Sequence, residues 1–275
     1  MEKRDPTPRY GVREQATSST AVELAMESLR LLGHAVVDSG LDGDALERLR
    51  SAFERVRTAY VREFGEERLR AIDEHNTIRC PLVYDPTFLD LASNPVILEL
   101  CDRLLGPGYI LNQQNGLVNP PRREAYNQAA YHRDLPYQHF VASRPLAINA
   151  VFCLDGFTAE NGATLVIPAS HKEEKFPSEA MIRECERALV APAGSFLVLD
   201  CMSYHRGGVN ATVRERRGVN HVYSIGLLRQ QIDLPALLGP DFPADAFMRR
   251  FLGYDYRAGS SIEEYLASRE RKSSR

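Results

Sequence analysis

Residues 109–134 read YILNQQNGLVNPPRREAYNQAAYHRD, and at this stretch the pattern of the chain changes. Before it, apolar residues recur at helical spacing. From it onward, short β-like runs follow one another, most of them separated by Gly, Pro or Asn. These runs lie at 109–118, 127–134, 145–154, 163–167, 189–191, 195–200 and 217–228. Many short strands at close spacing indicate a mainly β fold, and a double-sheet jelly roll is a natural closed form for it.

Helices are expected on both sides of this β region. Ser18-Ser19-Thr20 can cap a helix that runs to Leu32 and ends at Gly33. A short strand at 34–37 and helices at about 44–64 and 95–105 come next. We expect a single domain over residues 1–275, with no linker or internal repeat. Its parts are N-terminal helices at about 18–105, a jelly-roll core at about 109–230 and a helical tail at about 232–275.

Composition limits the function classes. The chain has 275 residues, 44% hydrophobic and 26% charged, as is ordinary for a soluble globular protein. A net charge of −3 argues against nucleic-acid or anionic-membrane partners. No apolar run approaches the length of a membrane span, and the N-terminus lacks a signal peptide's apolar stretch. The five cysteines lack CxxC spacing, which favours reduced thiols. We therefore expect a cytoplasmic monomer or homodimer.

The motif His132-Arg133-Asp134, followed much later by His205, has the composition of a 2-His-1-carboxylate site for Fe(II). Alternation along a strand at 127–134 would put His132 and Asp134 on one face. With 7 His and 37 acidic residues, roughly one chance His-x-Asp/Glu is expected, so the motif alone is weak. The alternatives are a buried hydrogen-bonded His–Asp pair and a strand-end histidine at position 205.

A second such motif is His171-Lys172-Glu173. Its neighbours Pro168 and Ser170 and its charge cluster indicate a surface loop, so we expect His171 to form a loop hydrogen bond rather than to bind metal. His221, on the last β run, is expected to be a packing residue.

Eleven residues after His205 lies Arg216, a permanent cation that can fork onto a carboxylate. A hairpin turn beginning at Gly207-Gly208 would return Arg216 beside the metal and point Arg217 to the opposite face. Because clusters such as 214–217 are usually solvated loops, Arg214 and Arg217 remain alternative anchors.

The run Asn161-Gly162-Ala163-Thr164-Leu165-Val166-Ile167-Pro168-Ala169-Ser170-His171-Lys172, with the His132 motif and His205-Arg206-Gly207-Gly208, resembles the phytanoyl-CoA dioxygenase family. The resemblance covers roughly residues 30–255 and includes Phe251-Leu252-Gly253-Tyr254. It implies a double-stranded β-helix, a cupin-like jelly-roll variant, that uses Fe(II), 2-oxoglutarate and O2 and releases succinate and CO2.

The resemblance also implies residue roles. His132, Asp134 and His205 match the iron ligands, and Arg216 matches the arginine that pairs with the distal carboxylate of 2-oxoglutarate. Gln113 is the expected polar contact to the co-substrate, with Gln114 and Asn112 as alternatives, and Thr164 is expected to face the same pocket. Halogenating relatives replace the carboxylate ligand with a small residue, so Asp134 favours oxygenation.

The substrate is expected to be a small polar molecule, hydroxylated in a specialised-metabolite (such as antibiotic), sugar or amino-acid-derived biosynthetic pathway. Tyr137 and Gln138 flank the triad, and His75 and Arg79 lie in a polar stretch expected to be a surface loop at the site's mouth. Desaturation, ring closure or ketone formation could follow from the same chemistry. The rival class is a non-catalytic, cupin-like metal- or ligand-binding module. A demethylase of protein or nucleic acid has little support, since the chain lacks a basic face.

Overall fold

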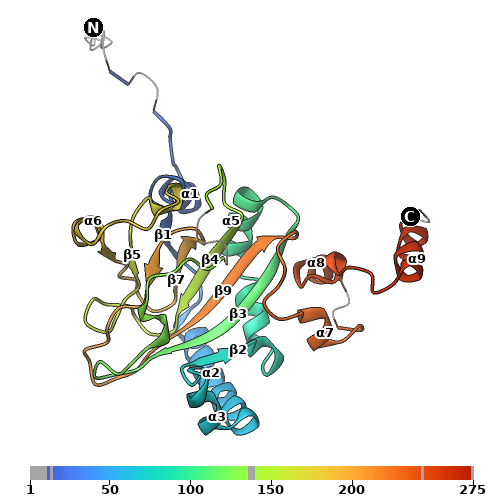
Figure 1. Ribbon diagram of the computed structural model, residues 1–275, viewed down its shortest axis with the longest axis horizontal. Coiled ribbons are helices and arrows are strands. Elements are labelled where there is room, and N and C mark those ends of the chain that lie inside the picture. The colour runs from blue at the N-terminus through green and yellow to red at the C-terminus, as the bar shows by residue number, and fades with distance from the viewer. Residues whose placement is uncertain (1–10, 13–14, 136–139, 243–244, 274–275) are drawn as a thin grey trace.

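The computed structural model describes residues 11–12, 15–135, 140–242 and 245–273. Within them, two antiparallel sheets face each other: a six-stranded sheet in the order β1-β7-β4-β9-β3-β2 and a three-stranded sheet in the order β6-β5-β8 (Figure 1). The large sheet is formed by β1 (His34–Asp38), β2 (Thr77–Arg79), β3 (Tyr109–Asn119), β4 (Ala147–Cys153), β7 (Ser195–Asp200) and β9 (Arg216–Ile225). The small sheet is formed by β5 (Leu165–Val166), β6 (Arg187–Ala188) and β8 (His205–Arg206). The predicted jelly-roll class is confirmed.

Helices precede, cover and follow the sheets. They are α1 (Ala21–Leu32), α2 (Gly43–Phe64), α3 (Glu66–Ala71), α4 (Thr87–Ala92), α5 (Pro95–Leu105), α6 (Glu179–Cys185), α7 (Leu234–Leu238), α8 (Ala246–Phe251) and α9 (Ile262–Ser273), with 3-10 turns η1 (Pro81–Val83), η2 (Asn127–Ala129), η3 (Ser170–Lys172) and η4 (Tyr254–Tyr256). The three predicted N-terminal helices are confirmed. Thr20 and Glu23 form a reciprocal capping box at α1, and Gly33 ends the helix at a φ of 80°.

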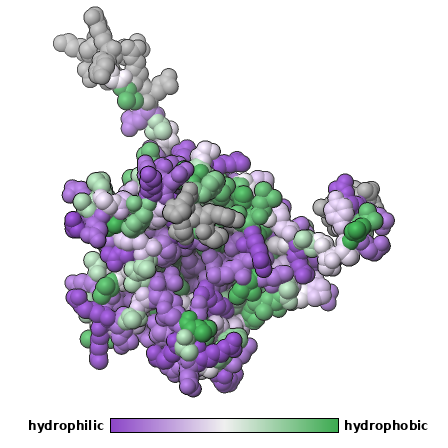
Figure 2. Space-filling view, in the orientation of Figure 1, coloured by the Kyte–Doolittle hydropathy of each residue, from purple (hydrophilic) through white to green (hydrophobic). Residues whose placement is uncertain are grey.

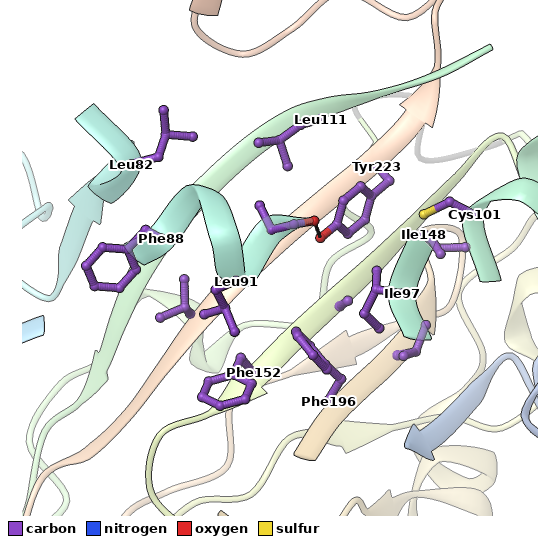
Figure 3. Packing of buried hydrophobic residues seen from close by; sticks show 14 of the residues in the cluster. Leu82, Phe88, Leu91, Ile97, Cys101, Leu111, Ile148, Phe152, Phe196 and Tyr223 are labelled. Carbon is purple, nitrogen blue, oxygen red and sulfur yellow. Dashed lines mark hydrogen bonds between the residues drawn. The ribbon is translucent and has the colours of Figure 1, made fainter. Parts of the chain in front are cut away.

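The main core lies between the large sheet and the helices on its outer face (Figure 3). Phe152 and Phe196 pack there against Ile97 of α5. The Tyr223 hydroxyl donates to the Ala92 carbonyl at 2.7 Å, which ties β9 to the end of α4. Because successive strand residues point to opposite faces, the residues of β9 that alternate with Tyr223 face the small sheet instead. Between the two sheets, a second apolar cluster includes Val151 and Leu199 of the large sheet and Val166 of the small one.

Four local predictions were wrong. The β run predicted at 189–191 is not a strand, since β6 ends at Ala188 and Ala191 makes only an isolated bridge, with Phe157. Residues 127–134 do not form a strand: they contain η2, and only His132 makes an isolated bridge, with His205. The stretch from His205 to Arg216 is no hairpin, since β8 belongs to the small sheet and β9 to the large one. The polar stretch before the β region includes a strand, β2, whose three residues pair with β3.

His171 is also placed differently from the prediction. It lies in η3 and is 2% exposed, with Nε2 3.3 Å from the Arg30 carbonyl oxygen. It forms a hydrogen bond as expected, but in the interior rather than on a surface loop. The φ of 62° at Ala169 turns the chain inward just before it.

His221 is the clearest pH-sensitive element of the core. It is fully buried, its Nδ1 bonds to the Ala150 carbonyl, and burial lowers its pKa to about 4. In the unfolded chain, this imidazole has a pKa of about 6.5, so between about pH 6.5 and pH 4 the unfolded chain binds a proton that the folded chain does not. The free energy of unfolding therefore decreases as the pH falls through this range, by up to about 3 kcal/mol.

We expect His221→Gln to flatten the fall in urea-unfolding free energy between pH 7 and pH 5. Burial raises the pKa of Asp200 to about 6, which works in the opposite direction but is present in both proteins. An unchanged pH slope in the variant would refute the assignment.

The face shown in Figure 2 is largely hydrophilic, with scattered apolar patches. No helix within the described residues is both long and apolar enough to cross a bilayer. The cysteines are unpaired, and all but Cys185 are buried, in line with the expectation of reduced thiols.

Candidate iron and 2-oxoglutarate site

His132, Asp134 and His205 meet between the two sheets. One ligand atom from each lies within 4.8 Å of the others. Asp134 Oδ1 is 3.9 Å from His132 Nε2 and 3.7 Å from His205 Nε2. Their meeting depends on the isolated bridge, in which the backbones of the two histidines exchange hydrogen bonds of 3.0 and 3.1 Å. This single antiparallel residue pair thus positions the ligands, a role that was expected of a full strand at 127–134.

Hydrogen bonds behind the triad set the tautomers of both imidazoles. His132 Nδ1 lies 2.9 Å from the Ala130 carbonyl oxygen, and His205 Nδ1 lies 3.0 Å from that of Ser203. A carbonyl only accepts, so each Nδ1 carries the hydrogen and each Nε2 presents a lone pair to the centre. Burial lowers the pKa of His205, which favours the neutral form that binds metal.

Asp134 is fixed from two directions. Its Oδ2 accepts a hydrogen bond from Asn149 Nδ2 at 2.9 Å, and its backbone N–H donates to the Cys201 carbonyl at 3.1 Å. The other oxygen, Oδ1, is the one that lies nearest both imidazoles. Two neutral imidazoles and one oriented carboxylate fit Fe(II) and leave the other coordination positions to ligands from outside the chain.

Arg216 enters the same cavity from β9. It is 3% exposed, its guanidinium lies 3.9 Å from the centroid of the Phe157 ring, and Tyr126 lines the same cavity. Its Nε has no hydrogen-bond partner, and no carboxylate of the described residues lies within 4 Å of the side chain. Burial lowers its pKa. A buried cation without an anion is costly, so this site fits an anionic ligand such as the far carboxylate of 2-oxoglutarate.

The other two arginines of the cluster lie elsewhere. Arg217 points to the opposite face and pairs with Asp155 at 2.9 Å and Glu54 at 2.8 Å. Arg214 is exposed. Geometry therefore favours Arg216 among the three, and its role stays a prediction.

The cavity holds residues from both sheets that the sequence motifs did not single out. Asn149 and Asn220 approach from the large sheet, and Tyr126 and Gln128 approach from the segment around η2. Tyr126 can reach this position because it packs against Gly207, where a Cβ would come within 2.6 Å of its ring. The alternation of β4 and β9 could have indicated the inward face of the two asparagines, but only with the strand register known.

Of the two residues other than Arg216 that were predicted to contact the co-substrate, only one lies in the triad cavity. Thr164 lines the cavity with the triad, whereas Gln113 does not. Gln113 accepts a hydrogen bond from Asn115 at 3.2 Å on β3. Gln114 lies on the outer face, where its side chain bonds to the backbone of Leu82. Asn112 bonds to Ser224 and to the Arg229 carbonyl.

The residues predicted to contact the substrate do not lie in the triad cavity where the structure describes them. Arg79 is ion-paired with Glu74 and donates to Gln231 at 3.3 Å. His75 Nε2 lies 3.1 Å from Asn76 Nδ2. Neither lines the cavity around the triad. Tyr137 and Gln138 lie outside the described residues.

The residues on either side of the two histidines form a second feature, which we call the Tyr–Arg clasp. In it, each histidine is preceded by a tyrosine that packs against the arginine following the other histidine. The pairs are Tyr131 with Arg206, 5.1 Å from ring centroid to guanidinium, and Arg133 with Tyr204, at 3.9 Å. The Phe176 ring contacts both tyrosines, at 5.3 and 4.9 Å. The clasp therefore joins the two chain segments that supply the triad.

Arg133 is the most buried member of the clasp, at 3% exposed. It donates to the carbonyls of Ser170, at 3.0 Å, and of Glu173. We expect Arg133→Met to weaken Fe(II) or Co(II) binding by about 10- to 100-fold, because it loosens the orientation of the ligands on both sides of it. Calorimetry and the Co(II) absorption spectrum measure this.

Arg249 provides a matched control. It also lies over a tyrosine ring, that of Tyr254 at 4.6 Å, and bonds to the Pro240 carbonyl, but it belongs to the tail. Arg249→Met should lower the melting temperature without changing metal affinity. If both variants lose stability and neither changes metal affinity, the clasp is only structural.

Comparisons with known proteins agree with this geometry. The model of the phytanoyl-CoA dioxygenase family matches residues 29–218. An uncharacterised protein of Mycobacterium tuberculosis is 30% identical over 256 residues, 90% of this chain and 92% of that protein. An iron/alpha-ketoglutarate-dependent dioxygenase of Penicillium thymicola is 36% identical over 92 residues, 31% of this chain and 29% of that protein.

Among solved structures, the non-heme alpha ketoglutarate dependent epimerase SnoN from nogalamycin biosynthesis has a similar fold. Its TM-score is 0.59 at 20% sequence identity, and the match covers 82% of this chain and 92% of that one. At this identity the likeness concerns the fold.

The two sheets and the triad define the class as a jelly-roll protein with a 2-His-1-carboxylate centre. The chain belongs to the phytanoyl-CoA dioxygenase family. It is a 2-oxoglutarate-dependent non-haem iron dioxygenase, and the predicted enzyme class and cofactors are confirmed.

Proposed function

We propose that the chain hydroxylates a small polar molecule in a biosynthetic pathway, with His132, Asp134 and His205 as iron ligands and Arg216 as the anchor of 2-oxoglutarate. The observation that carries the proposal is the shared cavity, which is lined both by an oriented triad and by a buried cation that has no carboxylate partner among the described residues. Iron, when bound, would use O2 as the oxidant, with one oxygen atom going to the substrate and the other to 2-oxoglutarate, which would leave as succinate and CO2.

The chain's own residues orient the reactants and exclude water. Arg216 would hold the co-substrate by its far carboxylate, and Thr164 lies beside the same cavity. Asn149 keeps one oxygen of Asp134 occupied, so the other is free for the metal. Phe157 and Tyr126 shield the guanidinium from water, which strengthens its attraction to an anion.

A polar substrate is supported by amide groups on the inward face of the large sheet. Asn115 and Asn149 are 5% and 2% exposed, and the Oδ1 atom of each lacks a hydrogen-bond partner. Buried acceptors of this kind favour a ligand with hydroxyl or N–H donors, since an apolar ligand would leave them unpaired. Desaturation, ring closure and ketone formation would use the same site.

The proposal is tested by giving the purified protein Fe(II), O2 and 2-oxoglutarate with a library of polar metabolites and measuring succinate. A substrate should raise succinate release above the slow background and gain one oxygen atom by mass spectrometry. Oxidation without oxygen gain would indicate desaturation, ring closure or ketone formation. No succinate and no calorimetric binding of 2-oxoglutarate would favour the non-catalytic ligand-binding alternative.

The remaining expectations stay part of the proposal. We propose a single domain over residues 1–275, in the cytoplasm, as a monomer or homodimer with a small-molecule substrate and no nucleic-acid or membrane partner. The net charge of −3 supports the last two points. Size-exclusion chromatography with light scattering measures the oligomeric state.

A further inference from the structure

A second and larger cavity, of about 400 Å³, lies at the end of the β3–β9 pair. Its walls come from Ile110 at the start of β3, from the segment after β9 that carries Leu227, Leu228 and Arg229, and from Tyr256 in η4. A volume of this size is typical of sites for small organic molecules. The triad cavity contains none of these residues.

Specific contacts hold the walls of this cavity in place. The β3–β9 register shifts between Leu111 and Gln113, which leaves Asn112 at a bulge. Asn112 Nδ2 donates to the Arg229 carbonyl at 3.1 Å. Gln230 donates to the carbonyls of Leu111, at 2.8 Å, and Leu252, at 3.0 Å. The loop that carries Arg229 is therefore tied to the sheet and to the tail.

The opposite wall is built on two glycines. The Tyr256 hydroxyl donates to the Gly108 carbonyl at 2.8 Å. A Cβ on Gly226 would come within 2.2 Å of the Tyr256 ring, and one on Gly108 within 2.8 Å of its hydroxyl. Only residues without a side chain allow the ring to lie so close. The tail thus contributes a flat aromatic face to the cavity.

The cavity adjoins the triad. Leu228, from its wall, packs on the small cluster that contains Leu135 and Val222. Leu135 directly follows Asp134 in the chain, and Val222 lies on the inward face of β9, two residues from Asn220 of the triad cavity. On a second side, Gln231 of the cavity wall accepts a hydrogen bond from Arg79 of β2. Leu228 therefore links the wall of this cavity to the residue that follows Asp134.

The charges of the cavity indicate what it would bind. Arg229 is exposed, and no carboxylate of the described part of the chain lies within 4 Å of its guanidinium. Arg257, also in the wall, pairs with Asp233 at 3.5 Å. Two cations and one anion leave a net positive charge. The rest of the wall offers apolar surface from Ile110, Leu228 and the Tyr256 ring.

We infer that this cavity is the outer part of the substrate site and binds an apolar, ring-bearing body that carries an oxyanion, such as a carboxylate, held by Arg229. The inference rests on the proposed function for the identity of the reaction, but binding in the cavity does not require it. The substrate would then have two ends: a polar part beside the amides near the triad, and an acidic, ring-bearing part here.

The test uses two fluorescent probes with the same ring system on the full-length protein: 8-anilinonaphthalene-1-sulfonate, which is anionic, and N-phenyl-1-naphthylamine, which is neutral. We expect Arg229→Gln to weaken the sulfonate by about 10-fold, because it removes a charge-assisted contact, and to leave the neutral probe unchanged. Arg62→Gln, an exposed arginine on α2, is the control and should change neither. Equal sulfonate affinity in the wild type and Arg229→Gln overturns the inference.

A second arm tests the substrate class through turnover. Pairs of ring-bearing carboxylic acids and their methyl esters are compared by substrate-dependent succinate release. The wild type should prefer the acids through a lower KM, and Arg229→Gln should lose that preference while its KM for 2-oxoglutarate stays unchanged. An equal response to acids and esters in the wild type counts against the inference. If no compound gives succinate while Arg229 still discriminates between the probes, the proposed function fails and the binding site stands.

Discussion

Replacing His132 or Asp134 with alanine is expected to abolish 2-oxoglutarate turnover and to lower Fe(II) affinity by more than about 100-fold. The loss of an outer-shell partner already costs 10- to 100-fold in affinity or activity, and a direct ligand should cost more. Both side chains reach one centre with their ligand atoms 3.9 Å apart. Calorimetric Fe(II) titration under anaerobic conditions and succinate release are the two measurements.

His171 gives this experiment its internal control. It belongs to the second His-x-Asp/Glu motif in the chain and is buried, but it bonds to the Arg30 carbonyl of α1. His171→Gln should therefore lower thermal stability and leave Fe(II) affinity unchanged. If it lowers Fe(II) affinity as much as His132→Ala does, the triad is assigned to the wrong motif.

Much of the fold could be predicted because its signals are local. Apolar periodicity and the cap at Thr20 predict α1, and helix α5 follows from Pro95 at its start and Gly106 after its end. Helix α4 and strand β2 were missed because six and three residues are too short to show a period. The segment at 127–134 was predicted wrongly because its extended shape at His132 comes from one long-range bridge to His205, which no local pattern records.

The same distinction between local sequence signals and long-range contacts holds for the site. The metal ligands belong to a motif with chemical meaning, so the sequence singles them out. Asn149 and Asn220 do not, because an asparagine on a strand is identified as a site residue only once the sheet register brings it beside Asp134 or Arg216. The same holds for the clasp: Tyr204 and Arg133 are 71 residues apart in the numbering and become neighbours only through the bridge between the histidines.

Arg216→Gln is expected to raise the KM for 2-oxoglutarate by at least about 30-fold. Truncating one partner of a buried charge pair costs about 2–5 kcal/mol, and each 1.4 kcal/mol corresponds to about tenfold. Arg216→Lys should restore only part of the affinity, since an ammonium cannot fork onto a carboxylate. Because iron is held by other side chains, Fe(II) affinity should stay within about twofold of the wild type. Calorimetry with 2-oxoglutarate and steady-state succinate release measure these values.

Arg217→Gln is the matched control, one residue away on the opposite face of β9. Its guanidinium pairs with Asp155 and Glu54 outside the cavity. These two ion pairs, on a half-buried side chain, make it a stability residue, so its loss should lower the melting temperature and leave the KM for 2-oxoglutarate unchanged. Were Arg217→Gln to raise that KM while Arg216→Gln did not, the anchor would lie on the other face of the strand. In that case, an anion other than 2-oxoglutarate would have to bind the unpaired Nε of Arg216.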